Sequence, residues 1–347
     1  MKRITRLAAL LPLIMVAAAC GTSDDGANDD VGSEAVETTV AETPSETTES
    51  APETTVPTAD SEVAEESDAE VADDPVEEEE EMVYPSAIIS LSPTATEMLY
   101  AVGAGDQVLA VDNFSNFPAE TADKMPGVSG YDPNVEAIIG LGPDLIVTDG
   151  TNPDLLAALD RAGIPHWEGP AAVTVDDTFE QILELGAATG HADEAGALVD
   201  ELTADLDALL ERIATLPELE TPLTFYHELD STYYSVTSET FIGSTYTSLG
   251  LRNIADLVEE ESYGYPQLSA EFILDKDPDI IFLACTIYCG ETPESVAARP
   301  GWDALTAVAA GHVVPLNDDI ASRWGPRIIE HMSAVVDAVE AVASVGE

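Results

Sequence analysis

Basic side chains are the scarcest chemistry-bearing groups in this sequence. The 347 residues include 68 Asp and Glu but only 11 Lys and Arg. Beyond the first six residues the only lysines are Lys124 and Lys276, and neither follows a glycine, which excludes the Gly-Lys-Ser/Thr signature of a phosphate-binding loop. Arg323 and Arg327 are therefore conspicuous neighbours, since a guanidinium can donate paired hydrogen bonds to a carboxylate, phosphate or hydroxamate. Arg327 follows Pro326, and we expect it to form a structural pair with a carboxylate.

The five histidines are not spaced as metal ligands. Neither H-x-H nor H-E-x-x-H occurs. His227, Glu228 and Asp319 could still hold a bare divalent cation from separate loops, which leaves a metal receptor as an alternative. The sequence also has no G-x-S-x-G elbow and no G-x-G-x-x-G after a strand. We therefore predict no catalytic residue, no metal site and no cofactor.

Two of the three cysteines lie close together. Cys285 and Cys289 follow an apolar stretch and have a spacing that is unusual for thiol redox motifs. Outside the cytoplasm such a pair is expected to form a local disulfide, which would close the intervening loop. A reactive dithiol is the alternative.

The third cysteine ends an export signal that spans residues 1–20. Three basic residues precede an apolar run from Leu7 to Val16, and small residues lead to Cys20. The small residues before Cys20 resemble a bacterial lipobox, in which the cysteine receives a diacylglycerol and becomes the mature N-terminus. We therefore expect an extracytoplasmic protein that Cys20 anchors to the cell membrane. The alternative is an ordinary signal peptide cleaved near Ala19.

Residues 21–84 are predicted to form a disordered acidic tether. Positions 22–82 contain 23 acids and no Lys, Arg or aromatic residue, so this segment cannot bury enough apolar surface to fold. Without these acids and the three bases of the signal, 45 acids and 8 bases remain in the body. This balance excludes ordinary binding to nucleic acid or to an anionic membrane face.

The body alternates short apolar strands with helices, which predicts an α/β fold with largely parallel sheets. Strands are expected from Ala87 to Leu91, from Val108 to Val111 and from Asp144 to Val147. Thr94 and Glu97 have the spacing of a capping box, which would start the first helix. From Ala192 to about Leu216, apolar residues recur every three or four positions along one helical stripe.

An internal repeat divides the body into two halves. Residues 134–139 and 143–147 recur, 135 positions later, as residues 269–274 and 278–282. Each copy has a capping residue, a glutamate in the first helical turn, a Pro-Asp turn and a buried strand. We predict two Rossmann-like lobes at residues 85–190 and 218–347, which a single long helix at 191–217 joins. Chance similarity of two α/β units is the alternative.

Five stretches in this order resemble a known family. They span 89–97, 127–131, 143–146, 265–271 and 319–328. The chain is similar to the substrate-binding proteins of bacterial ABC importers for cobalamin and iron siderophores, which have the class III periplasmic-binding-protein fold. The resemblance covers about Ala87 to Val342. It implies a monomer that carries a small-molecule ligand to an ABC permease and its ATPase.

The resemblance assigns a docking role to two glutamates. Glu136 and Glu271 match residues that face basic pockets on the two permease subunits. One acid in an equivalent place on each lobe can bridge a dimeric permease. The alternative is that each glutamate only complements the dipole of its helix.

The resemblance also implies a ligand between the lobes, at the ends of the strands. Asp319 and Arg323 match ligand contacts of cobalamin binders, whereas Tyr131 and Tyr265 lie where the family has cleft aromatics. Tyr233 and Trp324 complete the predicted binding set. The family's cobalamin pattern has Trp and Phe more often than Tyr, and tyrosine hydroxyls suit a more polar ligand such as a ferric siderophore. The alternative for any single tyrosine is half-buried packing.

We therefore expect a lipid-anchored receptor that captures a corrinoid or ferric chelate and makes or breaks no bond. A receptor for bare Zn or Mn is one alternative. A surface enzyme or adhesion protein that reuses the fold is the other.

Overall fold

The computed structural model describes residues 82–124, 127–217, 220–258 and 263–345. The predicted signal, Cys20 and almost all of the acidic tether lie outside this range. In the part of the chain that is described, no helix is both long and apolar enough to cross a membrane.

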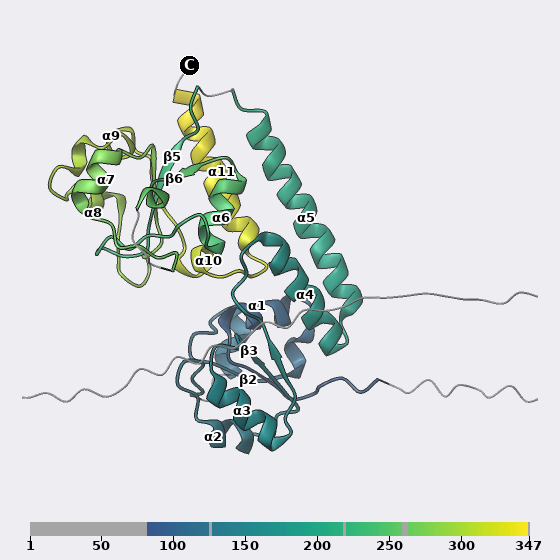
Figure 1. Cartoon of the computed structure of the whole chain (residues 1–347). Coiled ribbons are helices and arrows are strands. Elements are labelled where there is room, and N and C mark those ends of the chain that lie inside the picture. The colour runs from purple at the N-terminus through teal and green to yellow at the C-terminus, as the bar shows by residue number, and fades with distance from the viewer. Residues whose placement is uncertain (1–81, 125–126, 218–219, 259–262, 346–347) are drawn as a thin grey trace, which may run out of the picture. The chain divides into compact units, whose positions relative to one another are not determined.

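Two four-stranded parallel sheets form the framework (Figure 1). The first has the order β2-β1-β3-β4, and the second has the corresponding order β6-β5-β7-β8. The strands are β1 (Ile88–Ser90), β2 (Val108–Val111), β3 (Leu145–Thr148), β4 (His166–Glu168), β5 (Thr224–Glu228), β6 (Arg252–Asn253), β7 (Ile280–Leu283) and β8 (Val313–Pro315). The shared order explains the sequence repeat, and the predicted α/β class with two parallel-sheet halves is confirmed.

The strand registers place equivalent residues of the two halves at equivalent positions. Ile88 lies opposite Leu145 in the first sheet, and Phe225 lies opposite Ile280 in the second. All residues of β1, β3 and β7 are buried. Helices cover both faces of such sheets, so the central strands are continuous apolar runs.

The helices of the first half are α1 (Pro93–Ala101), α2 (Val135–Gly140), α3 (Pro153–Ala162) and α4 (Val175–Thr189), with 3-10 turns at Ala104–Gln107 and Ala119–Lys124. The start of α1 differs from the predicted capping box. Ser92 is the N-cap, and its hydroxyl accepts a hydrogen bond from the Ala95 amide. Glu97 therefore lies within α1 and is free to make long-range contacts.

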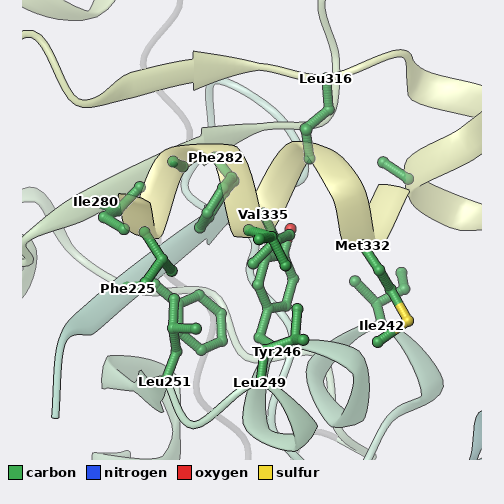
Figure 2. Close-up of a cluster of buried hydrophobic side chains, with 14 of the residues drawn as sticks. Phe225, Ile242, Tyr246, Leu249, Leu251, Ile280, Phe282, Leu316, Met332 and Val335 are labelled. Carbon is green, nitrogen blue, oxygen red and sulfur yellow. The ribbon is translucent and has the colours of Figure 1, made fainter. Parts of the chain in front are cut away.

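The second half contains α6 (Phe241–Ser248), α7 (Ala270–Lys276), α8 (Pro293–Ala297), α9 (Thr306–Ala310), α10 (Asp318–Ser322) and α11 (Ile328–Val345), with 3-10 turns at Ile254–Leu257 and Trp302–Ala304. Its core gathers around α11. Figure 2 shows Phe225, Tyr246 and Val335 in one buried cluster, where the Phe225 and Tyr246 rings stack with centroids 4.3 Å apart.

The long helix α5 (Ala192–Ala214) connects the halves, and its apolar stripe serves both cores. Leu198 and Leu202 pack into the core around β1. Leu206, Leu209 and Ile213 pack into the core around α11. One helical stripe thus contributes to two separate cores.

Candidate functional site

The carboxyl ends of the first sheet surround a hollow of about 440 Å³. In open parallel sheets, ligands bind outside these strand ends. The hollow is lined by residues that follow β1, β2 and β3, together with the loop before α2: Leu91, Pro93, Asp112, Phe114, Gly130, Tyr131, Asp149, Thr151, Asn152 and Pro153. Tyr131, a predicted ligand residue, is among them.

Gly130 fixes the loop that carries Tyr131. A Cβ atom at position 130 would lie 2.5 Å from the Leu91 carbonyl oxygen and 3.2 Å from Asp112 Oδ2, so only glycine fits here. This close approach holds the loop against the strand ends. The Tyr131 side chain is 92% exposed, and the exposed Phe114 lines the same hollow. Two aromatic faces are thus available at the rim.

Asp112 is the buried polar group of the hollow, with only 1% of its surface exposed. Its Oδ1 accepts hydrogen bonds from the Phe114 and Ser115 amides at 2.6 and 2.8 Å. Burial raises the pKa of the Asp112 carboxyl, and these amide hydrogen bonds oppose that shift in part.

Glu97 links the two halves of the molecule. It is 3% exposed, and its Oε1 accepts hydrogen bonds from Arg323 Nη1 at 2.8 Å and Arg327 Nη2 at 2.6 Å. Arg327 Nε also donates to Glu97 Oε2 at 2.8 Å. Burial lowers the pKa of Arg327, but the hydrogen bonds to Glu97 and the attraction of the nearby carboxylates together raise it. The carboxylate partner expected for Arg327 is therefore Glu97, which the sequence reasoning missed.

Arg323 is held by the loop that follows β2 as well. It donates to Asn116 Oδ1 at 2.9 Å, to the Phe114 carbonyl at 3.0 Å and to Asp319 Oδ1 at 2.8 Å. Asn116 Nδ2 in turn donates to Asp319 Oδ2 at 2.8 Å. The predicted pair Asp319 and Arg323 thus lies where the strand ends of one half meet those of the other.

The loop between Cys285 and Cys289 reaches the same place. The structure joins the two cysteines by a disulfide. Asp318 accepts hydrogen bonds from the amides of three loop residues, Thr286, Ile287 and Tyr288. The Tyr288 hydroxyl donates to Asp319 Oδ1 at 3.2 Å, and its ring is largely exposed. Tyr288 is a site candidate that the sequence reasoning missed, although its place inside a predicted disulfide loop was a usable signal.

In the second half, an arginine is enclosed by carboxylates at the end of β5. Arg299 Nη1 and Nη2 donate to Glu228 at 2.6 and 2.7 Å, and Nη2 also donates to Glu291 at 3.0 Å. Burial raises the pKa of Glu228, and the Arg299 pairing opposes this. The Arg299 guanidinium also lies over the Trp302 ring, 4.6 Å from its centroid.

The remaining predicted ligand residues have different surroundings. Tyr233 stacks on Trp302 with centroids 5.7 Å apart, so one of its faces is occupied. Tyr265 is 47% exposed. Trp324 packs against both cores and donates from Nε1 to Gln181 Oε1 at 3.0 Å. Tyr131 and Tyr265 therefore offer the most open aromatic surface of this set.

The residues of the metal alternative do not assemble. His227 is fully buried, and its Nδ1 lies 2.8 Å from the Tyr246 hydroxyl, whereas Glu228 is engaged by Arg299. Burial lowers the pKa of His227 to about 3 and that of His331 to about 4. Within the described residues, no group of three His, Cys, Asp or Glu side chains could hold a metal ion.

The two predicted docking glutamates occupy equivalent positions. Glu136 lies in the first turn of α2, which Asn134 caps, and Glu271 lies in the first turn of α7, which Ser269 caps. Both side chains are exposed. Neither forms an ion pair with another residue that the structure describes.

Comparisons with known proteins agree with the two-sheet fold. The model of a family described as "Periplasmic binding protein" matches residues 88–320. The chain is 31% identical over 265 residues to the cobalamin-binding protein of Halobacterium salinarum, and the alignment covers 73% of this chain and 69% of that protein. It is 28% identical over 260 residues to an ABC transporter substrate-binding lipoprotein of Bacillus subtilis, with 74% and 80% covered. The crystal structure of the vitamin B12 binding protein of Vibrio cholerae matches with a TM-score of 0.62 and 26% identity, over 74% of this chain and 98% of that one.

Proposed function

The chain belongs to the periplasmic binding protein family, and we propose that it captures cobalamin or a ferric siderophore between its two halves for an ABC importer. The reported relatives are named as binding proteins, the one from Vibrio cholerae as periplasmic, and the proposal involves no enzymatic step. The observation that carries it is the meeting of the two sets of strand ends. Asn116 from one half contacts Asp319 and Arg323 from the other, beside a hollow with exposed aromatic rims.

The aromatic residues give the site its affinity for a large ligand. Tyr131 is almost fully exposed and Tyr265 about half exposed, and an aromatic face contributes apolar contact area with little loss of conformational freedom. The two tyrosines come from equivalent loops, which precede α2 and α7. A flat ligand held between them would contact both halves at once.

A calorimetric titration with cyanocobalamin and with a ferric trihydroxamate tests this function. We expect one of them to bind at one-to-one stoichiometry and Tyr131→Ala to weaken binding by about tenfold or more, since buried aromatic anchors dominate interfaces. Tyr84→Ala is the matched control, because Tyr84 is also partly exposed but precedes β1, at the opposite edge of the sheet. If neither ligand binds, the proposal is refuted.

The proposal includes delivery to a permease through Glu136 and Glu271. Their exposure, equivalent placement and lack of ion pairs with described residues support this role. Lysine substitutions at both positions should abolish the ligand-dependent ATPase activity of the reconstituted importer and leave ligand affinity unchanged. Glu294→Lys is the control, since Glu294 is an exposed acid in the first turn of α8. Full activity of the doubly substituted protein would exclude this docking surface.

Membrane attachment through Cys20 is also part of the proposal. The lipobox-like segment and the lipoprotein relative in Bacillus subtilis support it. Expressed in a bacterium, the protein should incorporate labelled palmitate and partition into detergent, and Cys20→Ala should do neither. An unlabelled wild-type protein would indicate ordinary signal cleavage instead.

A further inference from the structure

We call the carboxyl ends of the strands in both sheets the ligand edge. The charged groups there define which ligands the site can accept, an inference that rests on the proposed function. Eight basic residues lie in the body of the protein, and all eight are among the described residues. Only three of them, Arg299, Arg323 and Arg327, lie at the carboxyl ends of the strands. Any anionic ligand would depend on these three for neutralisation.

The other five bases are remote from this edge. Lys124 donates to the carbonyl of Val108, the first residue of β2, and Arg252 is the first residue of β6. Lys276 and Arg161 lie in the last turns of helices that lead into the starts of strands. Arg212 pairs with Asp337 and Glu340 near the end of α5. None of these cations reaches the carboxyl ends of either sheet.

All three edge arginines are already paired with carboxylates of the protein. Arg323 is bound by Glu97 and Asp319, and Arg327 is bound by both oxygens of Glu97. Arg299 is bound by both oxygens of Glu228 and by Glu291.

Aromatic rings also cover two of these three guanidiniums. The Phe117 ring lies 4.0 Å from the Arg327 guanidinium, and the Trp302 ring lies 4.6 Å from that of Arg299. A ligand anion at any of these arginines would compete with carboxylates of the protein, of which Glu97 and Glu228 are almost completely buried, and displacement of one of them would leave a buried charge with fewer partners.

The hollow itself presents acceptors of hydrogen bonds. Asp112 and Asp149 line it, with the side-chain carbonyl of Asn152 engaged in capping α3. Asp112 is almost completely buried, and its Oδ2 lies toward Gly130 and the Tyr131 loop. Buried carboxylates repel a second anion and accept hydrogen bonds from amide or ammonium donors.

The geometry points to a ligand that is neutral or cationic and carries hydrogen-bond donors such as carboxamides, and to discrimination against anionic chelates. Among large flat or globular chelates, an amide-bearing corrinoid and a neutral ferric trihydroxamate meet this description. Haem, with its carboxylates, and a ferric tricatecholate do not.

A binding panel at fixed salt and pH 7.5 tests the inference with cyanocobalamin, a neutral ferric trihydroxamate, haem and a ferric tricatecholate. We expect a neutral ligand to bind at least about tenfold more tightly than either anionic one, because like charges at a desolvated interface are costly. If a neutral ligand binds but haem or the tricatecholate binds equally or more tightly, the inference is overturned and the proposed function stands. If none of the four binds, the proposed function and the inference both fail.

A substitution that liberates a cation provides a second readout. Asp319→Asn removes a carboxylate from Arg323, so the affinity for haem relative to cyanocobalamin should rise by about threefold or more. Asp275→Asn removes the same charge beside Lys276, far from the edge, and should leave this ratio unchanged. An unchanged ratio in Asp319→Asn would contradict the role assigned to the paired arginines.

Discussion

Glu97 is the residue whose environment differs most from what its neighbours in the sequence suggest. Its spacing from Thr94 fits a capping box, but Ser92 caps α1. Glu97 instead forms ion pairs with Arg323 and Arg327, which lie far along the chain. The local spacing is compatible both with a capping box and with these long-range ion pairs. Only the tertiary structure, which brings residues 323 and 327 to α1, distinguishes them.

Loss of the Glu97 carboxylate should destabilise the protein. Glu97→Gln leaves the largely buried Arg327 without its carboxylate partner and leaves Arg323 with Asp319 alone, and breaking a buried ion pair costs about 3 kcal/mol or more. Urea unfolding would measure the change in the free energy of unfolding. Glu340→Gln, which removes the partner of the more exposed Arg212, should have a much smaller effect. Equal losses in the two variants would contradict the structural role of Glu97.

The buried histidines predict that the stability of the protein depends on pH. Burial lowers the pKa of His227 to about 3 and that of His331 to about 4, so both are neutral in the folded protein. Below pH 6.5 the unfolded chain binds these protons more readily, so stability should fall between pH 6.5 and 4, by about 1.4 kcal/mol per pH unit for each histidine.

His331→Gln tests this dependence, because it removes one titrating group. The free energy of unfolding of this variant should depend less steeply on pH than that of the wild-type protein across the same interval. Comparison of the two slopes cancels the contribution of the many surface acids. Identical slopes would show that His331 is not buried in its neutral form.

At the scale of elements, α5 is the part that the sequence predicts best. A single apolar stripe fixes one buried face over its whole length, and helical periodicity is a local property. The strands are also predictable, because strands of a parallel sheet covered on both sides are short apolar runs. The place of Asn116 in the site is not predictable from the sequence, because it depends on contacts with Asp319 and Arg323 in a different part of the chain. Tyr288 has a local signal in its predicted disulfide loop, but its contacts with Asp318 and Asp319 again depend on the fold. The roles of the predicted ligand residues stay predictions.

Because the apolar stripe of α5 packs into both cores, a substitution along it should affect one core more than the other. Leu202→Ala and Leu209→Ala should each cost about 2–4 kcal/mol, since both side chains are buried. Hydrogen exchange should accelerate first around β1 and β3 for Leu202→Ala, and around β5 and β7 for Leu209→Ala. Leu210→Ala, at a more exposed position, is the control. Identical exchange patterns in both leucine variants would contradict the division of the stripe between two cores.

For the whole molecule, the dominant property is its charge of −57. The acids outside the signal and tether still outnumber the bases by 45 to 8, so the folded body repels itself and salt should screen this repulsion. The melting temperature should therefore rise steadily from low ionic strength to molar KCl. A melting temperature that falls or stays constant over this range would show that surface repulsion does not limit stability.

The central claim is that a ligand is held between the strand ends of both halves. Hydrogen exchange measured by mass spectrometry, with and without the tightest ligand from the binding panel, tests it most directly. We predict protection in two segments at once, around Gly130 and Tyr131 in one half and around Tyr265 and Gln267 in the other. Protection confined to one half, or located at the amino ends of the strands, would contradict the claim.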